Sequence, residues 1–411
     1  MTATNFQHYA GKNILLLQGP LGPFFKNLAT AFKEKNASVV KVNLNAGDQF
    51  FYPGAQYNFK GRLNEWKNFL EKIILIHKFD VILIFGQNRT YHLTARDLSQ
   101  KYNIELGVFE EGYIRPYYVT LENYGVNKYS RLPKDPLFYA QQPQISKPIL
   151  EKKIKNFFLC TMWFACLYYL TSCLFGIFYK HYQHHRKLSL TELFPWIRSL
   201  YRFYLYAYLE RSILKKLIKS YDQKFFLVPL QVHNDAQIKD FEKLNDIEHF
   251  IRNTVHSFYK FAPKHHLLVF KHHPLDRGYT DYSALIDDLG QQYFLKDRLI
   301  YIHDLHLPTL FKHARGVIVI NSTTGLQAIY HNTPVKVIGD AIYNFKGLAF
   351  QKPLHQFWKE AHKYKPNRDL YQKFKDYVIK HTQLNGSFYK KLKTKEAIGG
   401  LIWRNPNESN D

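Results

Sequence analysis

The chain has 411 residues, enough for about two or three domains with hydrophobic cores of their own. Its 57 Lys and Arg exceed its 33 Asp and Glu, and the formal net charge of +24 indicates an anionic partner such as nucleic acid, a membrane surface or an acidic substrate. The 31 Tyr and 33 Phe argue against a disordered chain, and residues 1–12 lack the apolar core of a secretion signal. The three cysteines have neither disulfide-framework nor metal-ligand spacing, which favours a reducing compartment.

The first third of the chain alternates short apolar runs with helical patterns. The apolar runs, at 13–18, 38–43, 81–85 and 104–109, have the character of buried parallel strands. Gly19 and Gly22 follow the first run and would let the backbone approach a ligand, although they do not form the dinucleotide motif G-x-G-x-x-G. The sequence therefore predicts a Rossmann-like domain over residues 1–145.

Two adjacent acids, Glu110 and Glu111, follow the fourth of these strands, with Arg115 close behind. One of two adjacent residues at a strand end points into the ligand cleft and the other packs away. Sugar-transfer chemistry uses such a carboxylate as a nucleophile or as a base. The alternative is a solvated acidic turn.

Residues 146–220 break the α/β rhythm. The stretch 157–179 carries no charge and is long enough to span a membrane, but a span would place the flanking α/β halves on opposite sides of the bilayer. The stretch 196–219 mixes Arg and Lys with Tyr and Leu, which suits an anionic interface. We therefore predict a helical hairpin in or on one leaflet, with a buried helix pair and a true span as alternatives. A metal site at His181, His184 and His185 is a weaker interpretation beside this basic surface.

A second α/β rhythm, with apolar runs at 225–230, 267–270, 300–303, 316–320 and 335–338, predicts another Rossmann-like domain over 221–384. The tail, 385–411, is basic and amphipathic and is expected to pack back on the first domain. The predicted fold class is α/β, with two Rossmann-like domains as in the GT-B glycosyltransferases and a helical insertion that associates with a membrane.

Two strand ends of the second domain carry phosphate-binding chemistry. In open α/β sheets, ligands bind at the carboxyl ends of the strands. One strand ends in Lys271, His272, His273 and Pro274, where Lys and His can hold a phosphate and Pro ends the strand. Another ends in hydroxyl residues at the start of a helix, an arrangement that binds anions: Ser322, Thr323 and Thr324. Ordinary loop histidines and plain helix capping are the alternatives.

No Asp-x-Asp motif stands at a strand end, which favours a mechanism without metal or cofactor. Hydrogen-bond donors, rather than Mg²⁺, would then neutralise the leaving phosphate.

Six ordered motifs between about residues 14 and 357 resemble the capsule polysaccharide synthesis proteins of the KpsS/LipB type. They are Gln18-Gly-Pro-Leu-Gly-Pro-Phe-Phe25, Asn43-Leu-Asn-Ala-Gly-Asp48, Phe109-Glu-Glu-Gly-Tyr-Ile-Arg-Pro116, Pro229-Leu-Gln-Val-His-Asn-Asp235, Phe270-Lys-His-His-Pro-Leu-Asp-Arg-Gly-Tyr279 and Ile320-Asn-Ser-Thr-Thr-Gly325. The resemblance implies a β-Kdo glycosyltransferase that uses CMP-Kdo. Such enzymes start the poly-Kdo linker between Gram-negative capsular polysaccharide and a phosphatidylglycerol-type lipid.

The resemblance also implies roles for individual residues. His273-Pro274 is similar to the family's phosphate-contacting His-Pro motif, and Glu111 stands where related Kdo transferases carry the Asp of a Glu-Asp-Gly motif. Glu111 and His273 are therefore the expected catalytic residues. The expected donor-binding residues are Lys271, Pro274, Ser322, Thr323, Thr324, Gln231 and Asp235. Acceptor or sugar contacts are expected from Gln18, Gly19 and Arg115.

The implied location is the inner face of the cytoplasmic membrane, with peripheral attachment to its anionic leaflet. The implied partners are the transferase that extends poly-Kdo and the capsule exporter. Two other functions stay open: a different CMP-sugar transferase, such as a sialyl type, and a non-catalytic partner in capsule assembly or export. Nucleic acid is not an expected partner, because the sequence contains no recognition module.

Overall fold

The computed structural model describes residues 3–143, 151–155, 157–183, 191, 193–233 and 246–404. The chain divides into two compact units, each with its own sheet. Unit 1 comprises Met1–Leu132, Ile145–Leu190 and Lys375–Asp411, and unit 2 comprises Pro133–Gln144 and Thr191–Phe374.

The sheet of unit 1 has the strand order β13-β14-β12-β6-β5-β4-β1-β2-β3. Strands β5, β4, β1, β2 and β3 are parallel, whereas β6 pairs antiparallel with β5. The four strands predicted in this part of the chain are present, as β1, β2, β4 and β5. The bounds are β1 (Asn13–Leu16), β2 (Ser38–Asn43), β3 (Tyr57–Asn58), β4 (Val81–Phe85), β5 (Glu105–Glu111), β6 (Tyr118–Asn123), β12 (Gln383–Gly386), β13 (Ala397–Ile398) and β14 (Leu401–Ile402).

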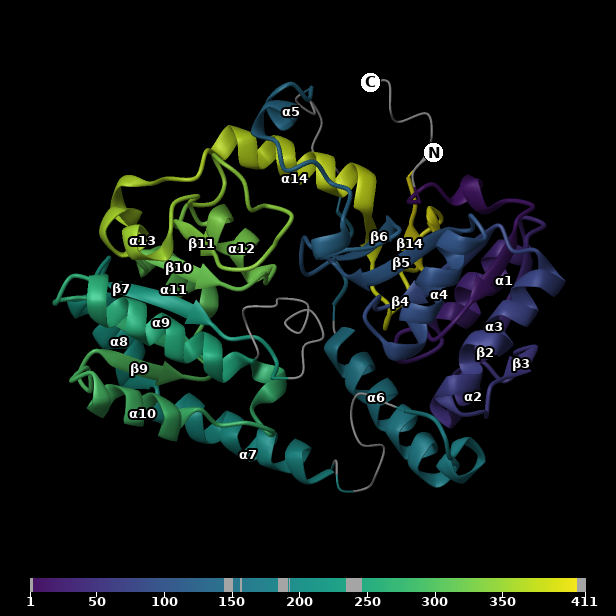
Figure 1. Ribbon diagram of the computed structural model, residues 1–411, viewed down its shortest axis with the longest axis horizontal. Helices are drawn as coiled ribbons and strands as arrows, with labels where there is room; N and C mark the ends of the chain where they lie inside the picture. The colour runs from purple at the N-terminus through teal and green to yellow at the C-terminus, as the bar shows by residue number, and fades with distance from the viewer. Residues whose placement is uncertain are drawn as a thin grey trace. The chain divides into compact units, whose positions relative to one another are not determined.

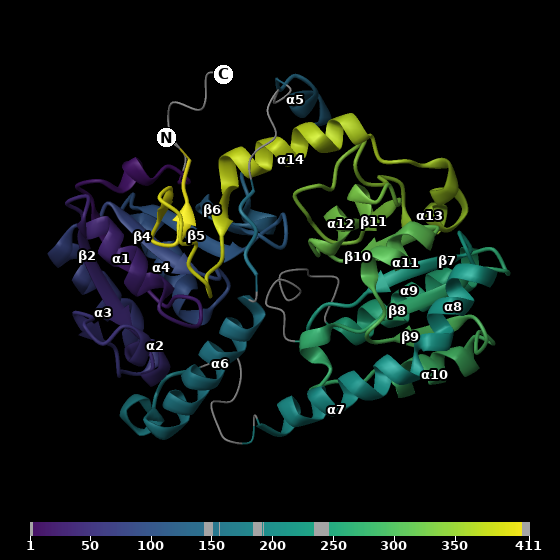
Figure 2. The ribbon, with the colours of Figure 1, turned by 180° about the vertical axis from the view of Figure 1, so that it is seen from behind.

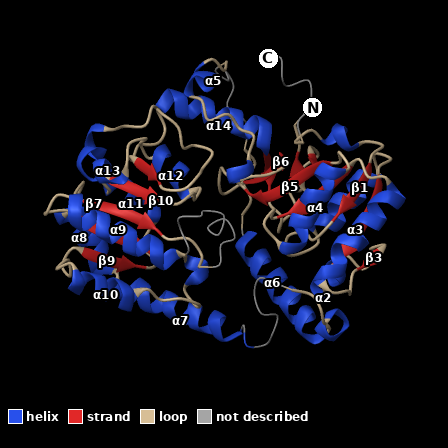
Figure 3. Ribbon diagram, in the orientation of Figure 1, coloured by secondary structure: helices blue, strands red, loops and turns tan. Residues whose placement is uncertain are grey.

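Helices cover both faces of this sheet (Figure 3). Helix α1 packs its Leu28 and Phe32 into one core with Ile14 and Leu83 of the strands. Helix α4 contacts β4 and β5 and packs with α3, over strand side chains that point the opposite way, such as Ile82. The helices are α1 (Phe24–Lys33), α2 (Ala46–Phe51), α3 (Leu63–His77), α4 (Thr90–Lys101) and α6 (Phe157–Leu174).

The C-terminal strands extend the sheet of unit 1. Strand β12 pairs antiparallel with β6, with Leu384 opposite Val119, and β14 pairs with β12. Figure 2 shows these C-terminal strands, in yellow, beside β6. Leu384 and Leu401 join the same core as α1. Helix α14 (Arg368–Thr382) leads into these strands.

Unit 2 contains a five-stranded, all-parallel sheet in the order β11-β10-β7-β8-β9 (Figure 1). Helices α9, α10 and α13 pack into one core with Phe226 and Phe270 of the sheet, and α11 and α12 contact β7 and β10. The strands are β7 (Phe225–Pro229), β8 (Leu267–Lys271), β9 (Leu299–Ile302), β10 (Gly316–Val319) and β11 (Val335–Val337). The helices are α5 (Pro136–Ala140), α7 (Leu193–Leu209), α8 (Arg211–Ser220), α9 (Ile247–Phe261), α10 (Ser283–Gln292), α11 (Leu307–His313), α12 (Thr324–Tyr330) and α13 (Leu354–Glu360).

Two Rossmann-like α/β units confirm the predicted fold class. The helices expected to form one hairpin belong to different units: α6 to unit 1, and α7 and α8 to unit 2. Among the described residues, no helix combines the length and the apolar character that crossing a membrane requires. Association of these helices with a membrane stays a prediction.

Candidate functional site

The loops after neighbouring strands of unit 2 meet at the carboxyl edge of its sheet. Strands β7, β8 and β10 are adjacent and parallel, so the segments after them lie at the same edge. Gln231, after β7, donates from Nε2 to Oδ1 of Asn321, after β10, over 2.8 Å. This bond joins two of the predicted donor-binding loops. Asp235 lies outside the described residues.

The two histidines after β8 have different environments. His272 is buried, and its Nδ1 lies 2.5 Å from the hydroxyl of Tyr301; burial, assisted by His303, lowers the pKa of His272 to about 4. His273 is half-buried and caps a short 3-10 helix (Pro274–Asp276), because its Nδ1 accepts a hydrogen bond of 3.2 Å from the backbone of Leu275. Alternation along the strand end therefore leaves His273 as the more accessible imidazole, followed by the exposed Pro274.

Lys271 points into unit 2. Its Nζ donates to the carbonyl oxygen of His303 over 2.8 Å, and the residue is 7% exposed. Burial lowers the pKa of Lys271, with a partial offset from Asp304 and Glu210. The ammonium therefore ties the loop after β8 to the loop after β9, and the phosphate contact expected of it stays a prediction.

The hydroxyl loop after β10 has a defined shape. The Oγ of Ser322 lies 2.6 Å from Oγ1 of Thr324 and accepts a hydrogen bond from the backbone N–H of Thr324. Tyr343 donates to the carbonyl oxygen of Ser322 over 2.5 Å, and a Cβ on Gly325 would lie 2.1 Å from the Tyr343 oxygen. A side chain at position 325 would therefore displace the phenol that holds this loop. Ser322, Thr323 and Thr324 are half-buried.

A further imidazole, His233, lies at this edge and is paired with the buried carboxylate of Asp276. Both residues stand inside motifs that the sequence singled out, but neither had been assigned a role. The contact joins residues 43 positions apart, so no local sequence signal indicates it.

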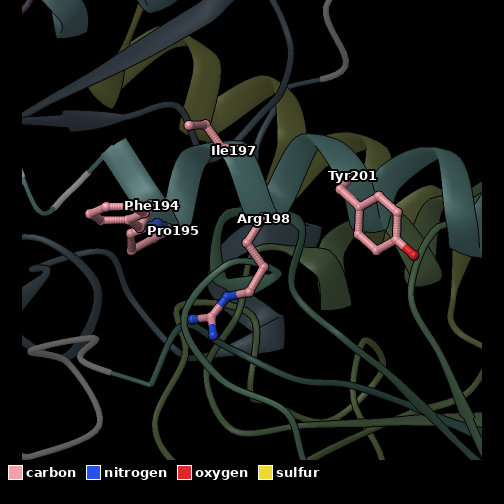
Figure 4. A pocket seen from close by; sticks show the side chains of 5 residues that line it. All are labelled: Phe194, Pro195, Ile197, Arg198 and Tyr201. Carbon is pink, nitrogen blue, oxygen red and sulfur yellow. The ribbon is translucent and has the colours of Figure 1, made fainter.

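Helix α7 is attached to the loop after β8 through its arginines. Arg198 donates to the carbonyl oxygen of Gly278, and Arg202 donates to the carbonyl oxygen of Arg277 over 2.8 Å and to Oδ2 of Asp281 over 3.1 Å. In Figure 4, Arg198 and Ile197 extend from opposite sides of the helix. A shallow hollow beside the start of α7 is lined by Phe194, Pro195, Ile197, Arg198 and Tyr201.

The junction between α7 and α8 is attached to the loop after β9. The carboxylate of Glu210 accepts hydrogen bonds from the backbone N–H groups of His303, over 2.6 Å, and Asp304, over 3.0 Å. The ring of Tyr206 stacks on His303 with centroids 3.5 Å apart. Helix α7 therefore rests on two of the loops at the carboxyl edge of unit 2.

In unit 1, Glu111 is the last residue of β5, and its Oε1 accepts a hydrogen bond of 3.0 Å from Tyr389. The turn that follows is fixed by Gln383, whose Oε1 accepts from the backbone N–H of Tyr113 over 3.0 Å. Arg115 is exposed, with Nε 3.3 Å from the carbonyl oxygen of Gly112. Glu111 and His273 belong to different units, so their predicted pairing across a cleft stays a prediction.

The loops after β1 and β2 contact helix α6. Gln18 is 3% exposed, and its Nε2 donates to the hydroxyls of Tyr168 and Tyr182, both over 2.8 Å. A Cβ on Gly22 would lie 2.7 Å from the ring of Phe164. The close approach expected of a ligand near Gly22 is therefore made by α6. The acceptor or sugar contacts expected of Gln18 and Gly19 stay predictions.

The described residues include no group of three or more His, Cys, Asp or Glu side chains placed to hold a metal ion. His184 and His185 lie outside them. Tyr389, which reaches Glu111 from the C-terminal segment, gave no signal in the sequence.

Comparison with known proteins identifies the family. Residues 80–389 match the family described as "Capsule polysaccharide biosynthesis protein". The chain is 39% identical over 382 residues to the Escherichia coli "Capsule polysaccharide export protein KpsS", covering 92% of this chain and 97% of the relative. It is 36% identical over 391 residues to the "Capsule polysaccharide modification protein LipB" of Neisseria meningitidis serogroup B, covering 93% of each.

Among solved structures, a similar one is "Thermosulfurimonas dismutans KpsC, beta Kdo 2,7 transferase", with 17% identity, a TM-score of 0.43 and coverage of 95% of this chain and 96% of that one. The sequence matches, which span most of the chain, confirm the resemblance carried by the six motifs. The chain belongs to the family of capsule polysaccharide biosynthesis proteins.

Proposed function

We propose that this protein is a β-Kdo glycosyltransferase that transfers Kdo from CMP-Kdo to a phosphatidylglycerol or lysophosphatidylglycerol acceptor. The bond between the anomeric carbon and the CMP phosphate breaks, and a bond forms from that carbon to an acceptor hydroxyl oxygen. CMP leaves, and the hydroxyl proton passes to a base. The product would start the poly-Kdo linker of a capsular polysaccharide.

One observation carries the proposal. In unit 2, the loop after β8, which carries His273, and the loop after β10, which carries hydroxyl side chains, lie at the same carboxyl edge of the parallel sheet. His273 caps the turn after β8, and the Gln231–Asn321 bond links the loop after β7 to the loop that carries Ser322 and Thr324. Such an edge is where α/β sheets bind nucleotides, and its donors suit a phosphate. These donors would neutralise the leaving CMP without a metal ion.

Glu111 is the proposed catalytic carboxylate of unit 1. It ends β5, the last strand of the parallel part of the sheet, and is oriented by Tyr389, as a group acting on a sugar must be. A nucleophilic carboxylate would give retention through two displacements, and β-linked product from a β-linked donor requires retention. As a base, Glu111 would instead accept the proton of the acceptor hydroxyl.

An anionic membrane is the proposed source of the lipid acceptor. Large apolar side chains are exposed on α6 and on α7, a feature that marks interaction surfaces: Phe158, Leu159, Trp163 and Leu174, and Phe194, Ile197, Leu200 and Tyr204. Exposed cations follow on α8: Arg211, Lys215, Lys216 and Lys219. Apolar and basic residues in this combination suit the interface of an anionic leaflet. We propose peripheral attachment to the inner face of the cytoplasmic membrane.

The test is incubation of the purified full chain with CMP-Kdo and lysophosphatidylglycerol in vesicles, followed by mass spectrometry. We expect one Kdo added to the lipid, release of CMP, and loss of product with Glu111→Gln. A parallel reaction with a CMP-sialic acid tests the sialyl-type alternative. Product from that donor and none from CMP-Kdo would contradict the Kdo assignment.

The export protein among the relatives favours a second candidate, a non-catalytic partner in capsule assembly or export. In that case no donor would give product, and substitutions at Glu111 and His273 would leave capsule production in cells unchanged. Charged substitutions on α7 would still impair it. The in vitro reaction and the cellular capsule assay together separate these two functions.

A further inference from the structure

A histidine–carboxylate pair lies at the carboxyl edge of unit 2. His233 follows β7, and its Nδ1 lies 2.5 Å from Oδ1 of Asp276, which stands in the 3-10 helix after β8. The backbone N–H of His233 donates to Oδ2 of Asp276 over 3.0 Å, and Thr280 donates to the same oxygen over 2.8 Å. The ring of His233 is therefore held through one nitrogen and through its own backbone.

The two members of the pair differ in exposure. The side chain of Asp276 is 1% exposed, whereas that of His233 is 36% exposed. A buried carboxylate requires a compensating positive charge or several hydrogen bonds, and Asp276 has hydrogen-bond contacts with the ring and the backbone of His233 and with Thr280. With Nδ1 directed at Asp276, Nε2 is the ring nitrogen left for a ligand, and it donates when both ring nitrogens carry a proton.

Three other basic residues at this edge do not offer a free positive charge to a ligand. The ammonium of Lys271 donates to the carbonyl oxygen of His303. His272 is neutral near pH 7, because burial lowers its pKa to about 4. Arg277 forms an ion pair with Asp304. His273 supplies one accessible imidazole here, and a phosphate that gains charge as its bond to the sugar breaks calls for a further donor beside it.

We propose that His233, held by Asp276, contacts the phosphate of the donor nucleotide through Nε2–H, and that Asp276 is its positioning residue. The proposal rests on the proposed function, because it assigns a ligand contact in the same donor site. A protonated ring, the form that an anionic ligand favours, would balance the charge that grows on the phosphate as its bond to the sugar breaks.

Binding measurements with CMP and with cytidine on the full chain test this contact. We expect His233→Leu to weaken CMP binding about ten- to a hundredfold, the range for a lost charge-assisted hydrogen bond, and to leave cytidine binding unchanged. His233→Gln retains a donor and should recover part of the affinity. His313→Leu is a matched control, since His313 pairs with Asp222 over 2.8 Å at the opposite, amino edge of the same sheet.

Asp276→Asn tests the positioning role. It should weaken CMP binding less than His233→Leu does, and it should have no further effect on CMP binding when combined with His233→Leu. If Asp276→Asn does not fold, the difference between His233→Gln and His233→Leu still tests the contact.

CMP binding by His233→Leu at the parent affinity would overturn the inference, as would equal losses of CMP and cytidine binding. Failure of the parent chain to bind CMP would overturn the proposed function itself. The two failures are therefore distinguishable.

Discussion

The phenol of Tyr389 donates a hydrogen bond of 3.0 Å to Oε1 of Glu111, across 278 positions of the sequence. Burial and the charge of Glu111 raise the pKa of Tyr389 well above 10, so the hydroxyl keeps its proton at any working pH. The C-terminal segment, which joins the sheet through β12, therefore orients the carboxylate at the end of β5.

Tyr389→Phe should lower kcat for Kdo transfer about tenfold and leave KM for CMP-Kdo unchanged, because it removes one orienting hydrogen bond of the carboxylate. Steady-state kinetics and thermal unfolding check this. Tyr364→Phe is the matched control, since Tyr364 donates to the carbonyl oxygen of Ala349 in unit 2 over 3.0 Å. An unchanged kcat in Tyr389→Phe would contradict the orienting role.

The sequence predicted the parallel cores of both units well, because their strands contain continuous apolar runs such as 81–85 and 267–270. It missed β6, whose Thr120 and Glu122 break the apolar pattern. Both are buried: Gln383, far along the chain, donates to Thr120, and Tyr113, in the turn before the strand, donates to Glu122. Buried polar strand residues cannot be distinguished from a solvated loop by periodicity alone.

The strand-end motifs predicted which loops gather at the carboxyl edge of unit 2, but not what each side chain does there. Lys271 and His272 stand beside His273 in sequence, yet both are buried and are bonded inside the unit. The roles proposed for His233 and Tyr389 depend on hydrogen-bond partners far along the chain. Side-chain direction at a strand end depends on tertiary packing, which a single sequence does not reveal.

Glu122 should make the stability of the protein pH-dependent. Burial raises its pKa to about 7, although Ser130 and Tyr113 donate to its carboxylate over 2.5 and 2.6 Å. The ordinary pKa of Glu is about 4.3, so the protonated form is favoured in the folded state. The contribution of this group to the unfolding free energy is fully present below about pH 4 and is lost as the pH rises through about 7, by about 4 kcal/mol in all.

Glu122→Gln should remove this dependence, because the amide does not ionise. Chemical denaturation between pH 4.5 and 8 checks the prediction. The unfolding free energy of the variant relative to the parent should rise between pH 4.5 and about 7 and level off above that. A difference that stays constant with pH would show that Glu122 ionises in the folded protein as readily as in the unfolded chain.

The exposed face of α7 should bind anionic vesicles. Leu200→Glu and Tyr204→Glu each replace a side chain more than half exposed by a negative charge, and we expect about tenfold weaker binding to phosphatidylglycerol vesicles. Co-sedimentation at low and high salt checks this. Ile76→Glu, at an equally exposed apolar position on α3, is the control and should bind like the parent. If both α7 variants bind vesicles as the parent does, this face of α7 does not contact the membrane.

The packing of helix α6 against α2 depends on the absence of a side chain at Gly47. A Cβ there would lie 2.6 Å from Oγ of Ser172 and 2.7 Å from the ring of Tyr168, whose hydroxyl accepts a hydrogen bond from Asn45. Gly47→Ala should therefore lower the unfolding free energy by about 1–3 kcal/mol, the usual cost of overpacking. Gly54→Ala is the control, because a Cβ at Gly54 meets nothing within 4 Å. If both variants unfold at the same denaturant concentration, the contact between α6 and α2 is not tightly packed in solution.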